Sequence, residues 1–248
     1  AKSIAVTGRV RAGATVRRLK RELEVIRQAY KRLVYSRQGV TKAYEWLYDN
    51  YYILEREGRL LARELEKLDP LPGTAQGEPA VTVHARRLCE AAKGALDAAA
   101  IEAYVAGAQR ERDFESCELN AFCPMLRAAL IEGAARACGE MPEEEREILF
   151  SDAVKTLNFL TTFDFSAIVE RQSRVEQIFR TDPAGVYAKM DERTRALYRR
   201  RLSVIARRRR MPESEAARLA VKLAGAGKTP RERHVGHYLL ERELDRPL

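Results

Sequence analysis

Two segments near the start of the chain repeat apolar residues at alternating spacings of three and four, and this repeat constrains the fold more than any other feature. In residues 15–37 it comprises Val16, Leu19, Leu23, Ile26, Tyr30 and Leu33. In residues 41–68 it comprises Leu47, Tyr51, Leu54, Leu61, Leu65 and Leu68, with Gly58 at the one gap. This spacing places the apolar side chains along one face of a helix. Because only a short break separates the two segments, we predict an antiparallel helical hairpin.

The remainder of the chain also favours helix. Ala, Leu, Arg and Glu dominate, and the 248 residues include only 14 Gly and 9 Pro, so few positions resist entering a helix. We predict an all-α fold of about ten helices, in which a hairpin in residues 1–70 packs on a helical bundle in residues 71–248, as one continuous domain. The further helices are expected at residues 80–93, 98–112, 116–138, 142–163, 166–180, 191–210, 212–224 and 230–244.

The stretch Tyr44–Leu54 holds the only tryptophan and four of the ten tyrosines. Since aromatic side chains bury the most apolar area, we expect Trp46, Leu47 and Tyr51 to lie in the core. Two polar residues, Asp49 and Asn50, interrupt the stretch. They are interpreted either as buried groups that hydrogen-bond nearby helix ends or as the floor of a polar pocket.

Local signals also predict part of the core and one turn. The helix that contains Pro124 is expected to bend there. Its apolar residues expected inside the protein are Met125, Leu126, Leu130 and Ile131. Pro183 and Gly185 favour a defined turn at residues 182–185, and Asp191 suits the first position of the next helix.

Motifs for catalysis, phosphate binding and metal binding are largely missing from the sequence. There is no GxSxG, no glycine-rich phosphate loop of a known type and no convincing acid–base pair. His234, His237 and Glu241 share a helix face but offer too few ligands for a metal site. The cysteines have no CxxC spacing and are expected to be reduced thiols; they are Cys89, Cys117, Cys123 and Cys138. We therefore predict no catalytic residue, no metal and no cofactor in this chain.

The net charge of +9 is concentrated in residues 191–210, which contain nine arginines against Asp191 and Glu192. Such a helix is interpreted as a solvated or ion-paired surface, as a contact for anionic lipid or a partner domain, or as a nucleic-acid binder. Nucleic acid is the least favoured, because only Tyr198 supplies a nearby aromatic ring. The candidate membrane or partner contacts are Arg199, Arg200, Arg201, Arg207, Arg208, Arg209 and Arg210.

Four stretches together resemble the N-terminal region of cyclic β-1,2-glucan synthases. They are EWLYDNYYIL (45–54), ELNAFCPMLRAALIEGAAR (118–136), QSRVEQIFRTDPAGVYAKMDERTRALYRR (172–200) and RHVGHYLLER (233–242). The third is the most specific, because DPAGVY is followed by MD, TR and YR at fixed offsets. Departures include FCPMLR in place of an aliphatic run before PMLR, and His237 where the family more often has tyrosine.

The resemblance implies a large membrane enzyme in which this helical region precedes membrane segments, a family 84 glycosyltransferase domain that uses UDP-glucose, and a family 94 phosphorylase-like domain. The chain has no DxD and no QxxRW, so it resembles the family without containing the active site. It begins at Ala1, and we expect it to be part of a longer polypeptide. The resemblance therefore implies a non-catalytic domain at the cytoplasmic face of the inner membrane, which positions the transferase domain.

Two alternatives remain. In the first, the domain binds β-glucan, and the candidate glucan or domain contacts are Trp46, Asp49, Asn50 and Tyr52. In the second, the chain is a basic helical protein that binds nucleic acid through the arginine-rich helix. Exposure of Trp46 is expected to distinguish the first alternative from a purely positioning domain.

Overall fold

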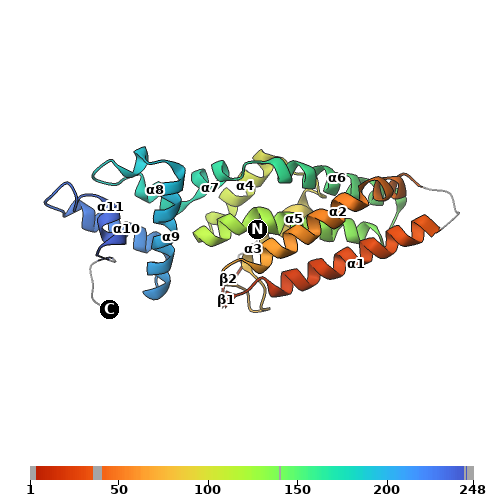
Figure 1. Cartoon of the computed structure of the whole chain (residues 1–248), viewed down its shortest axis with the longest axis horizontal. Helices are drawn as coiled ribbons and strands as arrows, with labels where there is room; N and C mark the ends of the chain where they lie inside the picture. Colours follow the sequence, from red (N-terminus) through yellow and green to blue (C-terminus); the bar gives the residue numbers. More distant parts are fainter. Residues whose placement is uncertain (1–3, 36–40, 140, 243, 245–248) are drawn as a thin grey trace. The chain divides into compact units, whose positions relative to one another are not determined.

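The computed structural model of the chain describes residues 4–35, 41–139, 141–242 and 244, and it is all-α apart from one short ribbon (Figure 1). The ribbon consists of β1 (Gly8–Val10) and β2 (Leu71–Gly73), which pair antiparallel with Arg9 opposite Pro72. The predicted fold class is thus confirmed. The ribbon was not predicted, because neither three-residue segment shows a pattern of strand length.

The predicted hairpin is present as α1 (Gly13–Tyr35) and α2 (Lys42–Glu66), which lie side by side in Figure 1. The antiparallel pairing follows from two contacts, since Tyr30 stacks on Tyr51 at 4.0 Å and Gly58 faces Leu23. A Cβ at Gly58 would lie 2.5 Å from a Leu23 methyl carbon. The glycine in the apolar repeat therefore allows the two helices to approach closely where the leucine fills the seam.

The chain divides into two compact units. The first unit comprises Ala1–Val105 and Ala121–Phe165, and the second comprises Ala106–Asn120 and Ser166–Leu248. The helices that follow the hairpin up to Thr162 are α3 (Ala80–Ala91), α4 (Ala98–Gln109), α5 (Ser116–Ala137) and α6 (Glu143–Thr162).

The core of the first unit lies around α5. The four predicted core residues of this helix are 0–1% exposed; they are Met125, Leu126, Leu130 and Ile131. The helix continues through Pro124 without being divided into two. The buried residues of α2 lie on the face predicted from the apolar repeat, and they include Leu47, Leu54, Leu61 and Leu65.

The second unit contains several shorter helices. These are α7 (Ser166–Gln172), α8 (Arg174–Phe179), the 3₁₀ turn η1 (Tyr187–Lys189), α9 (Glu192–Arg208), α10 (Glu213–Gly225) and α11 (Val235–Leu240). Its apolar core includes Phe179, Tyr187 and Leu202, and α10 contributes a row of buried alanines. Because alanines have little bulk, α10 can approach its neighbours closely.

Two predicted helices in this unit were wrong in extent. The single helix expected at 166–180 is divided at Ser173, whose hydroxyl accepts the backbone N–H of Glu176 and caps α8. The helix expected from Pro230 onwards begins only at Val235. The side chains of Thr229 and Glu232 accept each other's backbone N–H, at 3.2 and 3.1 Å, but these reciprocal bonds close a turn instead of opening a long helix.

The central position of α5 predicts a large response to loss of apolar volume. Leu130→Ala should lower the free energy of unfolding by about 2–5 kcal/mol, since the side chain is buried and its removal leaves a cavity. Leu60→Ala is the matched control, because Leu60 is 50% exposed. Urea titrations followed by circular dichroism measure both. Equal midpoints for Leu130→Ala and the wild type would contradict the assigned core.

Candidate functional site

A buried carboxylate, Glu176, lies at the centre of the polar interactions of the second unit. Its side chain is fully buried and receives hydrogen bonds from Arg199 at 2.6 Å, from the Tyr187 hydroxyl at 2.8 Å and from Arg180 at 3.0 Å. Arg195 lies 3.3 Å away as a further ion-pair partner. Burial raises the pKa of the Tyr187 hydroxyl, and the hydrogen bond to Glu176 raises it further. The carboxylate thereby joins α8, the η1 turn and α9.

A second buried carboxylate, Asp182, fixes the predicted turn. It accepts the backbone N–H groups of Val186 and Tyr187 at 3.3 Å and that of Val235 at 3.0 Å. Because an ionised carboxylate only accepts hydrogen bonds, His234 donates to it from Nδ1, at 2.8 Å. Gly185 has a φ of +63°, in the left-handed region that glycine adopts readily. The turn is thus tied to the start of α11.

Hydrogen bonds to Asp182 outweigh the effect of its burial. Burial acts to raise the pKa of the Asp182 carboxyl, but the bonds from His234 and Val235 favour the charged form, and the pKa lies below its usual value. The other ring nitrogen of His234 lies 3.3 Å from the Tyr198 hydroxyl. Both histidines considered as metal ligands therefore contact a carboxylate, since His237 lies 2.9 Å from Glu241. Across the described ranges no three His, Cys, Asp or Glu side chains are grouped as metal ligands would be.

The arginines of α9 lie on two different faces. Arg195 and Arg199 point inward and pair with carboxylates of the second unit, including Glu170, Glu176 and Glu192. Arg199 is only 7% exposed, so its guanidinium is not available at the surface. Of the other candidate contacts, Arg200, Arg207, Arg208 and Arg210 are exposed, whereas Arg201 and Arg209 are half-buried.

The four candidate glucan contacts on α2 do not form one site. Trp46 is half-buried, not buried as predicted, and the Lys155 ammonium lies 5.4 Å from its ring centre. Asn50 donates to the Trp46 carbonyl at 2.8 Å, within the same helix. Asp49 is exposed, so its interpretation as a buried group was wrong. Tyr52 lies on another side of the helix.

Tyr52 instead belongs to an exposed cluster of tyrosines, formed with Tyr48 and Tyr30. The ring centre of Tyr30 lies 5.9 Å from that of Tyr48 and 5.9 Å from that of Tyr52. Tyr48 is 55% and Tyr52 67% exposed. Hydrogen bonding to Tyr52, with a smaller effect of burial, raises the pKa of Tyr30 to about 12. The spacing of four between Tyr48 and Tyr52 could have indicated this cluster from the sequence.

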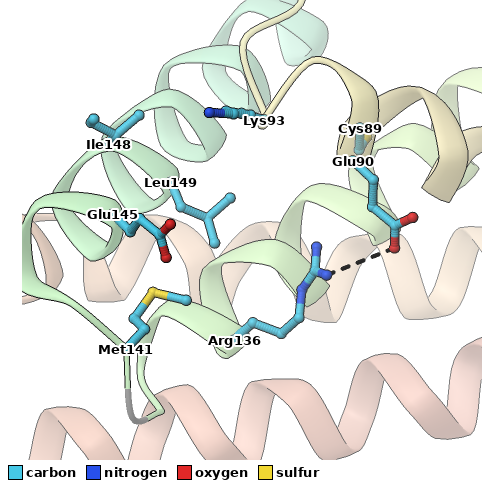
Figure 2. A pocket seen from close by; sticks show the side chains of 8 residues that line it. All are labelled: Cys89, Glu90, Lys93, Arg136, Met141, Glu145, Ile148 and Leu149. Atoms are coloured by element: carbon cyan, nitrogen blue, oxygen red, sulfur yellow. Dashed lines mark ion pairs between the residues drawn. The ribbon is translucent and has the colours of Figure 1, made fainter.

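A cleft of about 320 Å³ in the first unit is lined by apolar and charged side chains (Figure 2). Met141, Ile148 and Leu149 line it, and the Arg136 side chain reaches Glu90 at 3.7 Å. Burial raises the pKa of the Cys89 thiol in this cleft to about 12, so the thiol is a poor nucleophile. All four cysteines are free, as predicted. The cleft can accept a small amphipathic molecule but offers no activated nucleophile.

A second cavity of the first unit, about 350 Å³ in volume, is lined by several charged side chains. Ion pairs between its own walls occupy most of its charged groups: Arg18 lies 3.4 Å from Glu132, and Arg86 contacts Glu78. Glu22 also lines it, and burial together with the charge of Glu132 raises the pKa of the Glu22 carboxyl. The walls are thus held mainly by their own ion pairs.

Removal of the charge at Glu176 is expected to destabilise the second unit. Glu176→Gln should cost about 3–5 kcal/mol, because several guanidinium groups would lose a buried counter-ion. Glu192 also pairs with Arg199, but the Glu192 side chain is 45% exposed. Glu192→Gln should therefore cost less than about 1 kcal/mol. Urea unfolding measures both changes. A similar loss in the two variants would contradict the central role of Glu176.

The lowered pKa of Asp182 predicts a pH dependence. A carboxyl with a depressed folded pKa stabilises the protein above its unfolded pKa, near about 4, and loses this contribution as the pH falls through the folded value. In Asp182→Asn the decrease of the urea midpoint between pH 7 and pH 3 should therefore be smaller than in the wild type. Asp49→Asn, at an exposed carboxylate, should leave the decrease unchanged. An equally large decrease in Asp182→Asn would exclude the assigned role.

The comparison with known proteins does not assign the chain to a family. No protein-family model and no curated protein matches it. The resemblance described above therefore depends on the four sequence stretches, and the function has to be argued from them and from the contacts of the second unit.

Proposed function

We propose that the chain is a non-catalytic helical domain of a cyclic β-1,2-glucan synthase-like protein, and that it holds the glycosyltransferase domain of that protein in position. The observation that carries this proposal concerns the polar residues of two stretches: 172–200, where the resemblance is most specific, and 233–242. Those residues bond to one another within the second unit. They include Ser173, Glu176, Asp182, Tyr187, Asp191, Arg195, Arg199 and His234.

Each of these groups has a supporting role that explains why its residue type is needed. Ser173 and Asp191 cap the first turns of α8 and α9, which stabilises helix ends. Glu176 and Asp182 join segments that are distant in the chain. A catalytic carboxylate must leave room for a reacting group, whereas these two are surrounded by protein donors. The pattern therefore favours a domain whose distinctive residues maintain its shape.

The proposed setting is the cytoplasmic face of the inner membrane, with the other domains of the same polypeptide as partners. These would be the family 84 transferase domain and the family 94 phosphorylase-like domain. The excess of Arg and Lys is typical of cytoplasmic segments near membranes. None of the helices in the described part of the chain has the length and apolar character needed to cross a bilayer.

The proposal predicts that the chain alone does not transfer glucose. Purified chain incubated with labelled UDP-glucose should give no glucan. The complete reading frame should continue into membrane segments and a DxD, and membranes that contain its product should form cyclic glucan. Glu176→Gln in the complete protein should lower glucan formed per mole of protein, whereas Glu192→Gln should not. Transfer by the isolated chain, or a reading frame without a transferase domain, would refute the proposal.

A second candidate function is binding of β-glucan, and the exposed tyrosine cluster favours it. Tyr48 and Tyr52 each present a ring to solvent beside Tyr30, and aromatic faces are suitable surfaces for the C–H groups of sugar rings. The candidate site is therefore centred on Tyr52 instead of Trp46.

This second candidate is tested with short β-1,2-linked glucan oligosaccharides and isothermal titration calorimetry. If an aromatic contact contributes up to about 1.5 kcal/mol, loss of one ring weakens binding about tenfold. Tyr52→Ala should show such a loss. Tyr35→Ala is the control, since Tyr35 is 84% exposed but lies outside the cluster. The absence of heat with the wild type, or equal affinities for the two variants, would exclude the tyrosine cluster as a glucan site.

A further inference from the structure

One face of α9 presents a continuous row of arginines and apolar residues to solvent. An α-helix turns by about 100° per residue, so positions that differ by three, four or seven lie on the same side. The residues of this row, which we call the arginine stripe, are Arg193, Leu197, Arg200, Val204, Arg207 and Arg208. Between Arg193 and Arg207 the stripe extends over about 21 Å along the helix.

Three of the four arginines in the stripe are not neutralised by any residue that the structure describes. Arg193, Arg200 and Arg207 are exposed, and their guanidinium groups make no hydrogen bond or ion pair with any described residue. No acidic residue of α9 lies within the stripe. Leu197 is 64% exposed between Arg193 and Arg200, which is an unfavourable position for a leucine in water.

The opposite face of α9 fixes the direction in which the stripe points. Arg195 and Arg199 pair with the buried Glu176, and Leu202 and Ile205 are buried in the apolar core. Rotation of the helix would break these ion pairs and expose apolar surface. The stripe is therefore held in one orientation, and a partner surface does not have to order it.

We propose that the arginine stripe docks on anionic phospholipid headgroups, with the guanidinium groups at the phosphates and Leu197 at the level of the upper acyl chains. Arginine side chains are long enough to reach headgroups while a neighbouring apolar side chain enters the interface. The mixture of arginines with Leu197 and Val204 favours a lipid surface over nucleic acid. Tyr198, the one aromatic residue of α9, is engaged with His234 on another face and is not available to stack on a base.

This inference deepens the proposed function and rests on it for the cellular setting. Vesicle binding is measured with the chain alone, so a failure of the transferase assays and a failure of docking can be told apart. The stripe also differs from the set of arginines predicted from the sequence. Arg199 is excluded from it by its buried ion pairs, and Arg193 is added. The stripe also lacks three other predicted arginines, namely Arg201, Arg209 and Arg210.

The test uses co-sedimentation of the chain with vesicles of phosphatidylcholine containing phosphatidylserine, at low and at raised salt. Each arginine near such a surface contributes about 1 kcal/mol, or about fivefold in affinity. The triple variant Arg193→Gln, Arg200→Gln and Arg207→Gln should therefore bind about 100-fold more weakly. Leu197→Ser should weaken binding to a smaller extent. Vesicles of pure phosphatidylcholine should bind neither the wild type nor the variants.

The matched control removes the same charge elsewhere. Arg17, Arg21 and Arg63 are exposed and make no ion pair in the part of the chain that the structure describes. Their triple glutamine variant should bind as the wild type does, and circular dichroism should show both triple variants folded. Three results would overturn the proposal: no binding by the wild type at low salt, an equal loss in the control, or unchanged vesicle binding by the stripe variant. The last result, together with a loss of DNA retention by the same variant, would assign the stripe to nucleic acid.

Discussion

The second unit depends on one buried negative charge. Transfer of a carboxylate out of water is costly, and the cost is offset only when several donors surround it in good geometry. Glu176 meets this condition through Arg199, Arg180 and Tyr187, with Arg195 nearby. Arginine suits the position because its guanidinium stays charged and carries donors in several directions. A single carboxylate can therefore determine where α8, the η1 turn and α9 meet.

The same residue type serves two purposes on α9, and position around the helix decides which. Two arginines that face the carboxylates are part of the folded interior, and those on the other side remain hydrated. The internal pairs are largely protected from salt, whereas the charge on the outer face is screened over about 8–10 Å at ordinary ionic strength. Salt therefore separates the two roles, because it weakens surface contacts of the helix before it affects the fold.

The hairpin could be predicted from the sequence, because a repeat of apolar residues is a local signal and Gly58 falls where Leu23 needs space. The division at Ser173 was missed although it has a local signal: the Ser173 hydroxyl accepts the backbone N–H of Glu176, three residues on, and caps α8. The paired strands could not be predicted, since they depend on tertiary contacts with little local signature. Glu176 illustrates the same limit: its spacing to Arg180 suggests an ordinary helical pair, while its partner Arg199 lies 23 residues away in the chain. Tyr52 and Trp46 were both predicted as glucan contacts. Their positions along one helix could already have shown that the two side chains lie on different sides of it.

The order of segments along the chain has a consequence for synthesis. The second unit is discontinuous, since Ala106–Asn120 belongs to it together with Ser166–Leu248. Within that early segment Phe114 is buried, and Ser116 bonds to Glu213 at 2.9 and 2.7 Å. Domains generally fold from the N-terminus as they leave the ribosome. Here Ser116 must wait for its partner until Glu213 has emerged, and no single cut can release the second unit intact.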